Sequence, residues 1–148
     1  MWTKSKSLFL SRIMIAFFLV ALVAGSVGLR WILGWYFGFT GKSFASMLPL
    51  MATLWACAAP AFLALLHLGG MLKRIAAGEV FVEENVKALR AISWCCFLVA
   101  IVFFAFFFYY ILGLILAILA AFAGLVLRVV KNVFAQAVEI KEENDLTV

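Results

Sequence analysis

Acidic side chains are scarce in this chain of 148 residues and are confined to its second half. The first 78 positions contain none, and the seven present lie outside the long apolar stretches, at Glu79, Glu83, Glu84, Glu139, Glu142, Glu143 and Asp145. Proton- and cation-coupled transporters commonly place a carboxylate among their membrane helices. The sequence therefore argues against a pump driven by a membrane-buried carboxylate.

Charge of either sign is absent between Arg90 and Arg128. The 35 residues from Ser93 to Leu127 would form a helix about 52 Å long, whereas the hydrocarbon core of a bilayer is roughly 30 Å thick. This stretch is too long for one span and long enough for two. It predicts a helical hairpin with its turn at Tyr109–Gly113, where the tyrosines suit the membrane interface and the glycine suits a tight turn.

Hydrophobic residues make up 68% of the chain and charged residues 13%, against roughly 45–50% and 25% in soluble domains. The sequence predicts one all-α domain over 1–148, an integral membrane four-helix bundle made of two helical hairpins. The expected spans are 8–29, 47–72, 92–109 and 113–134. A signal peptide cleaved near Ala24–Ser26 is the competing interpretation of the first span, but its length and the three later spans favour a membrane helix.

Basic residues indicate the orientation, because cytoplasmic loops are enriched in lysine and arginine. Ten of the twelve lie on one side, at Lys4, Lys6, Arg12, Lys73, Arg74, Lys87, Arg90, Arg128, Lys131 and Lys141. We expect both termini and a central loop, 73–91, to be cytoplasmic in a bacterial inner membrane. The net charge of +5 then reflects topology, and no direct binding of nucleic acid is expected. The opposite loop, Arg30–Ser46, is aromatic and predicts an interfacial belt or a ligand-binding lid.

The central loop carries a helical pattern of its own. Apolar residues recur at Val82, Val86, Leu89 and Ile92, and Glu83 stands four residues before Lys87, which is the spacing of a helical ion pair. The pattern predicts a short cytoplasmic amphipathic helix over 83–92. This helix would form an elbow on the membrane surface or a docking surface for a cytoplasmic partner.

The cytoplasmic tail, 135–148, is polar. We expect the helix of the fourth span to fray near Lys141 or Glu142, followed by an extended segment, Leu146–Val148. Such a segment is either a disordered terminus or a peptide that adds to the sheet edge of another protein.

These two cytoplasmic segments carry a resemblance. The loop, Gly78–Phe81 through Asn85–Ile92, and the ending, Glu139–Val148, are similar to those of domain-of-unknown-function family 2975, small bacterial membrane proteins with four spans. The resemblance brings no catalytic residue. It implies a cytoplasmic partner, because members are often encoded beside a Cro/CI-type helix-turn-helix regulator. Members often have Ser or Thr after the loop phenylalanine, and Val82 at that position predicts a weaker helix cap.

Chemically reactive side chains are few. His67 is the only histidine, and it is expected at a depth similar to that of Cys95 and Cys96. Together they suggest a metal or haem site, but no CxxC or HxxxH spacing supports one. We expect His67 to form a hydrogen bond with a neighbouring helix, and we expect the cysteines to act as small packing residues between helices. No constellation for hydrolysis and no glycine-rich nucleotide loop is present, so no catalytic residue, metal or cofactor is predicted.

Small residues at four-residue spacing predict close helix packing. The pairs are Ala24 with Gly28, Ala52 with Ala56, Ala117 with Ala121, and Ala120 with Gly124. The third span is rich in phenylalanine instead, and those rings are expected to face lipid or a second subunit.

Two functional hypotheses follow. The first is a non-enzymatic membrane anchor or sensor, with homo-oligomerisation left open, that engages a cytoplasmic regulator through its central loop and tail. Its candidate residues are Phe81, Glu83, Glu84, Lys87, Arg90, Glu142, Asp145, Leu146 and Val148. The alternative is a protein that binds or transports a small molecule or lipid in the space between helices near Pro60.

Overall fold

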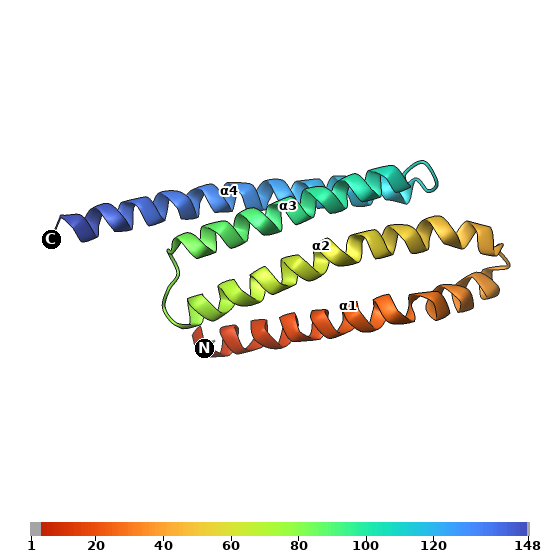
Figure 1. The fold of residues 1–148 in the computed structure, drawn as a ribbon, viewed down its shortest axis with the longest axis horizontal. Coiled ribbons are helices and arrows are strands. Elements are labelled where there is room, and N and C mark those ends of the chain that lie inside the picture. The colour runs from red at the N-terminus through yellow and green to blue at the C-terminus, as the bar shows by residue number, and fades with distance from the viewer. Residues whose placement is uncertain (1–3, 148) are drawn as a thin grey trace.

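The computed structural model describes residues 4–147, and this part of the chain consists of four α-helices with no strand. The helices are α1 (Lys4–Thr40), α2 (Phe44–Ala76), α3 (Glu83–Phe106) and α4 (Leu112–Leu146) (Figure 1). Each is long and apolar enough to cross a membrane. The prediction of an all-α protein built from two helical hairpins is confirmed.

The helices form an open series, in which each packs on its neighbours along the chain. Among the described residues the backbone of α1 comes close to that of α2 alone, and the backbone of α4 to that of α3 alone. Figure 1 shows the start of α1, the α2–α3 connection and the end of α4 at one end of the molecule. The polar segments singled out in the sequence therefore share that end.

The first helix is longer than expected. Helix α1 continues to Thr40, and the connection to α2 is only three residues, 41–43, so most of the loop predicted over Arg30–Ser46 is wrong. The reason is packing: Leu29, Leu33 and Phe37 are buried in a cluster with Met47 of α2. Their spacing of four residues keeps them on one helix face, which favours continuing the helix. Gly41, with φ 67°, then reverses the chain.

A separate short amphipathic helix over 83–92 is not present. Helix α3 runs without a break from Glu83 to Phe106, since no glycine or proline interrupts it and its buried face continues from Val86 to Ala100. Val82 is the N-cap and makes no side-chain capping bond, as its apolar side chain predicts.

The turn between α3 and α4 lies at 107–111, slightly before the predicted position. Gly113 belongs to the first turn of α4 rather than to the chain reversal, and it lacks a positive φ. A Cβ atom there would lie 2.7 Å from the backbone nitrogen of Phe107 and 2.8 Å from the carbonyl oxygen of Phe103. Glycine is needed here for close approach, not for a special backbone conformation.

Helix α4 is also longer than predicted. It continues through Lys141 and Glu142 to Leu146, so the expected fraying and the extended segment from Leu146 are wrong. The Thr147 hydroxyl donates to the carbonyl oxygens of Glu143 and Asn144 at its end. Val148 lies outside the described residues.

Small residues close the contact between α3 and α4. Ala117 and Gly124 are buried, and the Ser93 hydroxyl donates a 2.8 Å hydrogen bond to the Gly124 carbonyl oxygen. A Cβ at Gly124 would lie 3.2 Å from the Cys96 Cβ. The small-residue prediction therefore holds here, whereas Ala24, Ala52 and Ala56 are exposed. The phenylalanines divide, with Phe106 buried and Phe104 and Phe108 exposed.

Candidate functional site

The connection between α2 and α3 is fixed by one buried amide. Asn85 is 0% exposed, and its Oδ1 accepts a 2.7 Å hydrogen bond from Arg74 Nε. Its Nδ2 donates to the carbonyl oxygens of Glu79 at 3.0 Å and Val80 at 2.8 Å. The Asn85 side chain thus joins Arg74 to the loop backbone. These bonds fix the conformation of the α2–α3 connection and so the shape of its surface. Gly78, with φ 87°, supplies the turn before it.

Sequence reasoning missed this pair. In the sequence, Arg74 indicates only the membrane orientation, and Asn85 stands out only as part of the family-like motif. The available signal was that Asn85 is the lone uncharged polar residue in the first two turns of α3, next to the apolar positions Val86 and Leu89. A polar side chain in such a place requires partners.

Phe81 joins this connection to the last helix. Its ring centroid lies 5.5 Å from that of Phe134 in α4, and its side chain is still 43% exposed. Phe134 in turn packs against the cluster formed by Met71, Ala88 and Leu89. The loop and α4 are therefore in contact.

The charged candidates at the start of α3 lie on the surface. Glu83 and Lys87 form the predicted ion pair at 3.3 Å, with both side chains exposed, so its contribution to stability is at most a few tenths of a kcal/mol. Glu84 offers its backbone carbonyl to Arg74 at 3.4 Å, and Arg90 is exposed. All four side chains are accessible to a partner.

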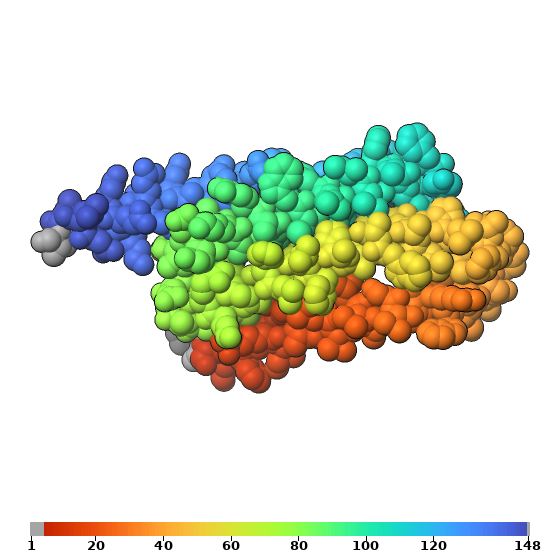
Figure 2. All heavy atoms as spheres, viewed as in Figure 1, coloured from red at the N-terminus to blue at the C-terminus, as the bar shows by residue number. Residues whose placement is uncertain are grey.

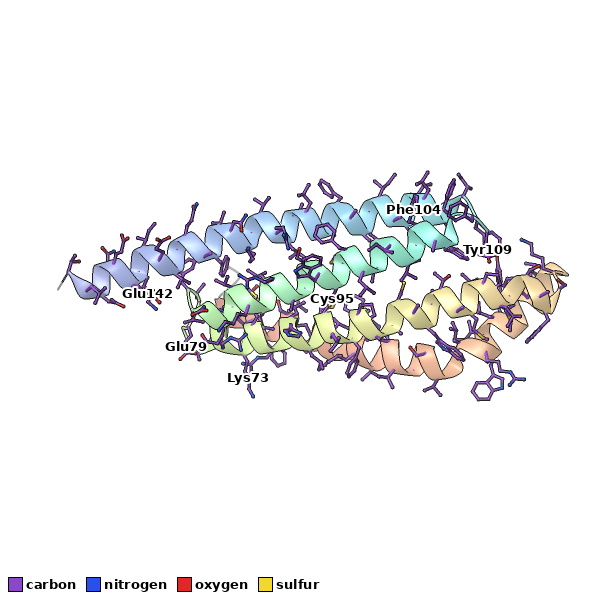
Figure 3. The ribbon with its side chains drawn as sticks, turned by 45° about the horizontal axis from the view of Figure 1, so that its top comes forward. Lys73, Glu79, Cys95, Phe104, Tyr109 and Glu142 are labelled. Carbon is purple, nitrogen blue, oxygen red and sulfur yellow. The ribbon has the colours of Figure 1, made fainter. Side chains whose placement is uncertain are left out.

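The tail candidates lie on a helix that leaves the rest of the molecule. Every described residue from Glu139 to Thr147 is exposed, and the blue end of α4 stands clear of the other helices (Figure 2). Figure 3 shows Glu142 on this extension, past the loop that carries Glu79. Glu142 is eight residues beyond Phe134, or about 12 Å along a helix. The predicted residues thus form two groups, one around Phe81 and one around Glu142, Asp145 and Leu146.

The extension has an unfavourable charge distribution for an isolated helix. Glu139, Glu142, Glu143 and Leu146 follow i, i+3, i+4, i+7 spacing and share one face. Acidic residues near a helix C-terminus oppose the helix dipole, like charges at this spacing repel, and the last turn has no basic residue. A positively charged neighbour would relieve both effects.

His67 and the cysteines, the candidates for a metal or haem site within the membrane spans, do not form one site in the described residues. His67 Nδ1 lies 2.8 Å from the carbonyl oxygen of Leu63, so it bonds its own helix rather than a neighbouring one. Cys57, Cys95 and Cys96 are free cysteines. Over residues 4–147, no group of three or more His, Cys, Asp or Glu side chains has the arrangement of a metal site.

An apolar groove does lie beside Pro60. It has a volume of about 280 Å³ and runs between Gly25 and Leu29 of α1 and Cys57, Ala58 and Ala61 of α2. The Trp55 Nε1 of α2 donates to the carbonyl oxygen of Ser26, a residue of α1 that lines the groove, at 3.1 Å. Pro60 itself is buried.

The four apolar helices, with their polar segments gathered at one end, define a multi-helix membrane protein. The chain belongs to the family described as "Protein of unknown function (DUF2975)", whose model matches residues 8–148. The resemblance seen in the loop and tail is therefore confirmed over nearly the whole chain. Comparison with curated proteins and with solved structures gives no match.

Proposed function

We propose that this protein is a non-enzymatic membrane anchor or sensor that binds a basic surface of a cytoplasmic protein, with the α4 extension as its main contact. The observation that carries the proposal is the exposed acidic helix from Glu139 to Leu146. We place the protein in the bacterial inner membrane with this end in the cytoplasm, in accordance with the lysine and arginine distribution.

The chemistry of the extension favours a folded, basic partner. Its four acidic residues have no ion pair within the described chain, and Leu146, 87% exposed, adds an apolar contact at the end of the same face. Complementary charge steers association and selects partners. The helix-turn-helix regulator class that the family resemblance implies has a basic surface of this kind, since it contacts nucleic acid phosphates.

The α2–α3 connection forms the second contact. The hydrogen bonds of Asn85 hold this loop in one conformation, so binding would not have to order it. Phe81 offers a partly exposed ring beside Phe134. A partner that reaches both groups would have to extend about 12 Å along α4 from Phe134 to Glu142, which is within the size of a small domain.

The test is co-purification of the full-length protein with a helix-turn-helix regulator of the class that the family resemblance implies. The double substitution Glu142→Gln and Asp145→Asn removes two charges and keeps the helix. Two lost ion pairs of about 0.5–1 kcal/mol each lower affinity roughly fivefold to thirtyfold. Deletion of Glu139–Val148 should abolish capture, and 0.5 M salt should weaken it.

Lys141→Gln is the matched control, because it lies on the same exposed turn and carries the opposite charge. We expect it to leave capture unchanged or to increase it. Equal capture by the full-length protein and the deletion variant, with equal amounts in the membrane, would remove α4 from the proposal.

The groove beside Pro60 favours a second candidate, the binding or transport of a small apolar molecule or lipid. Ala61→Trp would fill the groove, whereas Ala59→Trp, at an exposed position outside it, is the control. Flux or ligand retention in liposomes should fall for the first variant only. Equal effects of the two variants, or neither flux nor ligand retention with wild type, would rule this candidate out.

A further inference from the structure

Arg128 of α4 is held by two aromatic rings of α3. Its guanidinium carbon lies 5.1 Å from the ring centroid of Trp94 and 5.9 Å from that of Phe97. The two rings are themselves T-shaped, with centroids 6.2 Å apart. A cation over an aromatic face at these distances is attracted by the ring, so the orientation of this side chain is fixed before any ligand binds.

The protein leaves the hydrogen-bonding capacity of this guanidinium unused. Arg128 Nε is buried and has no hydrogen-bond partner. The guanidinium makes no ion pair within residues 4–147, where Glu83 with Lys87 is the pair formed. Nε is the only nitrogen of Arg128 that is both buried and without a hydrogen-bond partner. The two terminal nitrogens therefore form the accessible edge of the guanidinium. That edge presents parallel N–H donors, which suit an oxyanion.

A second arginine lies at the same level. The bond between Ser93 and Gly124 sets the register of these antiparallel helices. Arg90 precedes Ser93 by three residues and Arg128 follows Gly124 by four, so their levels differ by only about 1.5 Å. Arg90 is exposed and stands four residues before Trp94, which places both on one face of α3. Arg90 therefore lies on the same face of α3 as the indole that Arg128 contacts.

These residues mark the boundary of the apolar part of the hairpin. Arg90 and Arg128 are the last and first charges on either side of the charge-free stretch, and tryptophan is enriched at the depth of lipid headgroups. On the turn-facing side of the pair, Ile101 of α3 and Leu125 of α4 are exposed, at 69% and 54%. An anionic group at the arginines would therefore have exposed apolar side chains on its turn-facing side, about 4.5 Å along the helix axis at Leu125 and about 16.5 Å at Ile101.

We propose that Arg128, held by Trp94 and accompanied by Arg90, binds the phosphate of an anionic glycerophospholipid whose acyl chains lie against Ile101 and Leu125. Basic sites between membrane helices select anionic headgroups in this manner. The apolar surface below the guanidinium favours a lipid over free phosphate, because a free anion gains nothing from it. The site does not depend on the α4 extension or on the groove beside Pro60.

The test uses the full-length protein in a zwitterionic detergent, titrated with phosphatidylglycerol or phosphatidylcholine and followed by native mass spectrometry. We expect phosphatidylglycerol to be retained at least tenfold more tightly. Arg128→Gln should reduce its affinity about tenfold or more, since a charge-assisted hydrogen bond is lost. Arg128→Lys should also reduce it, because lysine lacks the planar fork of donors.

Lys73→Gln is the matched control: it removes one exposed charge at the same end of the molecule, on α2, whose backbone does not approach that of α4. Its effect should not exceed about fivefold, the value for one surface cation. The melting temperature of each variant without lipid shows whether the fold is retained, and Arg128→Lys keeps the test informative if Arg128→Gln unfolds.

Three results would overturn the proposal. One is equal losses for Arg128→Gln and Lys73→Gln, which would indicate general electrostatic attraction. Another is wild-type affinity for Arg128→Lys, which would remove the requirement for a guanidinium. The third is displacement of phosphatidylglycerol by inorganic phosphate at the same concentration, which would exclude the contribution of the acyl chains.

Discussion

Replacing Asn85 with alanine would remove the three hydrogen bonds that join α2, the connecting loop and α3. One of these comes from a charged donor, Arg74, and contributes about 1.5–3 kcal/mol, while the two donated to loop carbonyls contribute about 1 kcal/mol each. Water replaces part of this at the exposed end of the molecule. We therefore expect Asn85→Ala to lower the free energy of unfolding by about 2–4 kcal/mol.

The measurement is denaturant titration in mixed micelles, followed by far-ultraviolet circular dichroism. Asn132→Ala is the matched control, because Asn132 is exposed on α4 and its side chain makes no hydrogen bond with the described residues, and we expect a change within 0.5 kcal/mol. Asn85→Asp keeps an acceptor for Arg74 but loses the two donated bonds, so it should also be less stable than wild type. A loss below about 1 kcal/mol for Asn85→Ala would refute the view that this side chain organises the loop.

Further predictions concern packing and topology. Gly124→Ala should lower the unfolding free energy by about 1 kcal/mol or more, because the new methyl group crowds α3, whereas Gly25→Ala, which meets open space, should be neutral or raise it by up to about 1 kcal/mol. Gly113→Ala meets backbone atoms rather than side chains, and we expect a larger loss than at Gly124 in the same titration. In a variant without native cysteines, Glu79→Cys and Lys42→Cys should react with a membrane-impermeant maleimide from opposite sides; labelling from the same side would contradict the hairpin topology.

The membrane class, the two hairpins and the grouping of polar segments could be predicted, because they depend on where charge is absent over long distances. The stretch between Arg90 and Arg128 determines one hairpin whatever its side chains do. Helix ends were predicted less well. Whether α1 ends at Leu29 or Thr40 depends on contacts that Leu33 and Phe37 make with Met47 of α2. Their four-residue spacing is visible in the sequence, but the residue of the other helix that buries them is not.

The candidate site likewise has residues that the sequence reveals and others that depend on contacts between helices. The exposed positions Glu83, Lys87 and Glu142 were found because charge outside a span is visible in the sequence. The partners of Asn85 and the rings around Arg128 were not found, since each depends on the register between two helices. Gly113 is an intermediate case: the residue was recognised, but its reason is the distance to the Phe107 backbone rather than its own φ.

The serial packing of the helices has a consequence for biosynthesis. Each helix finds its packing partner in the one made just before it, and none waits for a helix at the far end of the chain. Most contacts are therefore between neighbours in sequence, an arrangement that speeds folding. As the chain enters the membrane, α2 can pack on α1, α3 on α2 and α4 on α3 in the order of their synthesis. The acidic end of α4 is made after the helices that position it.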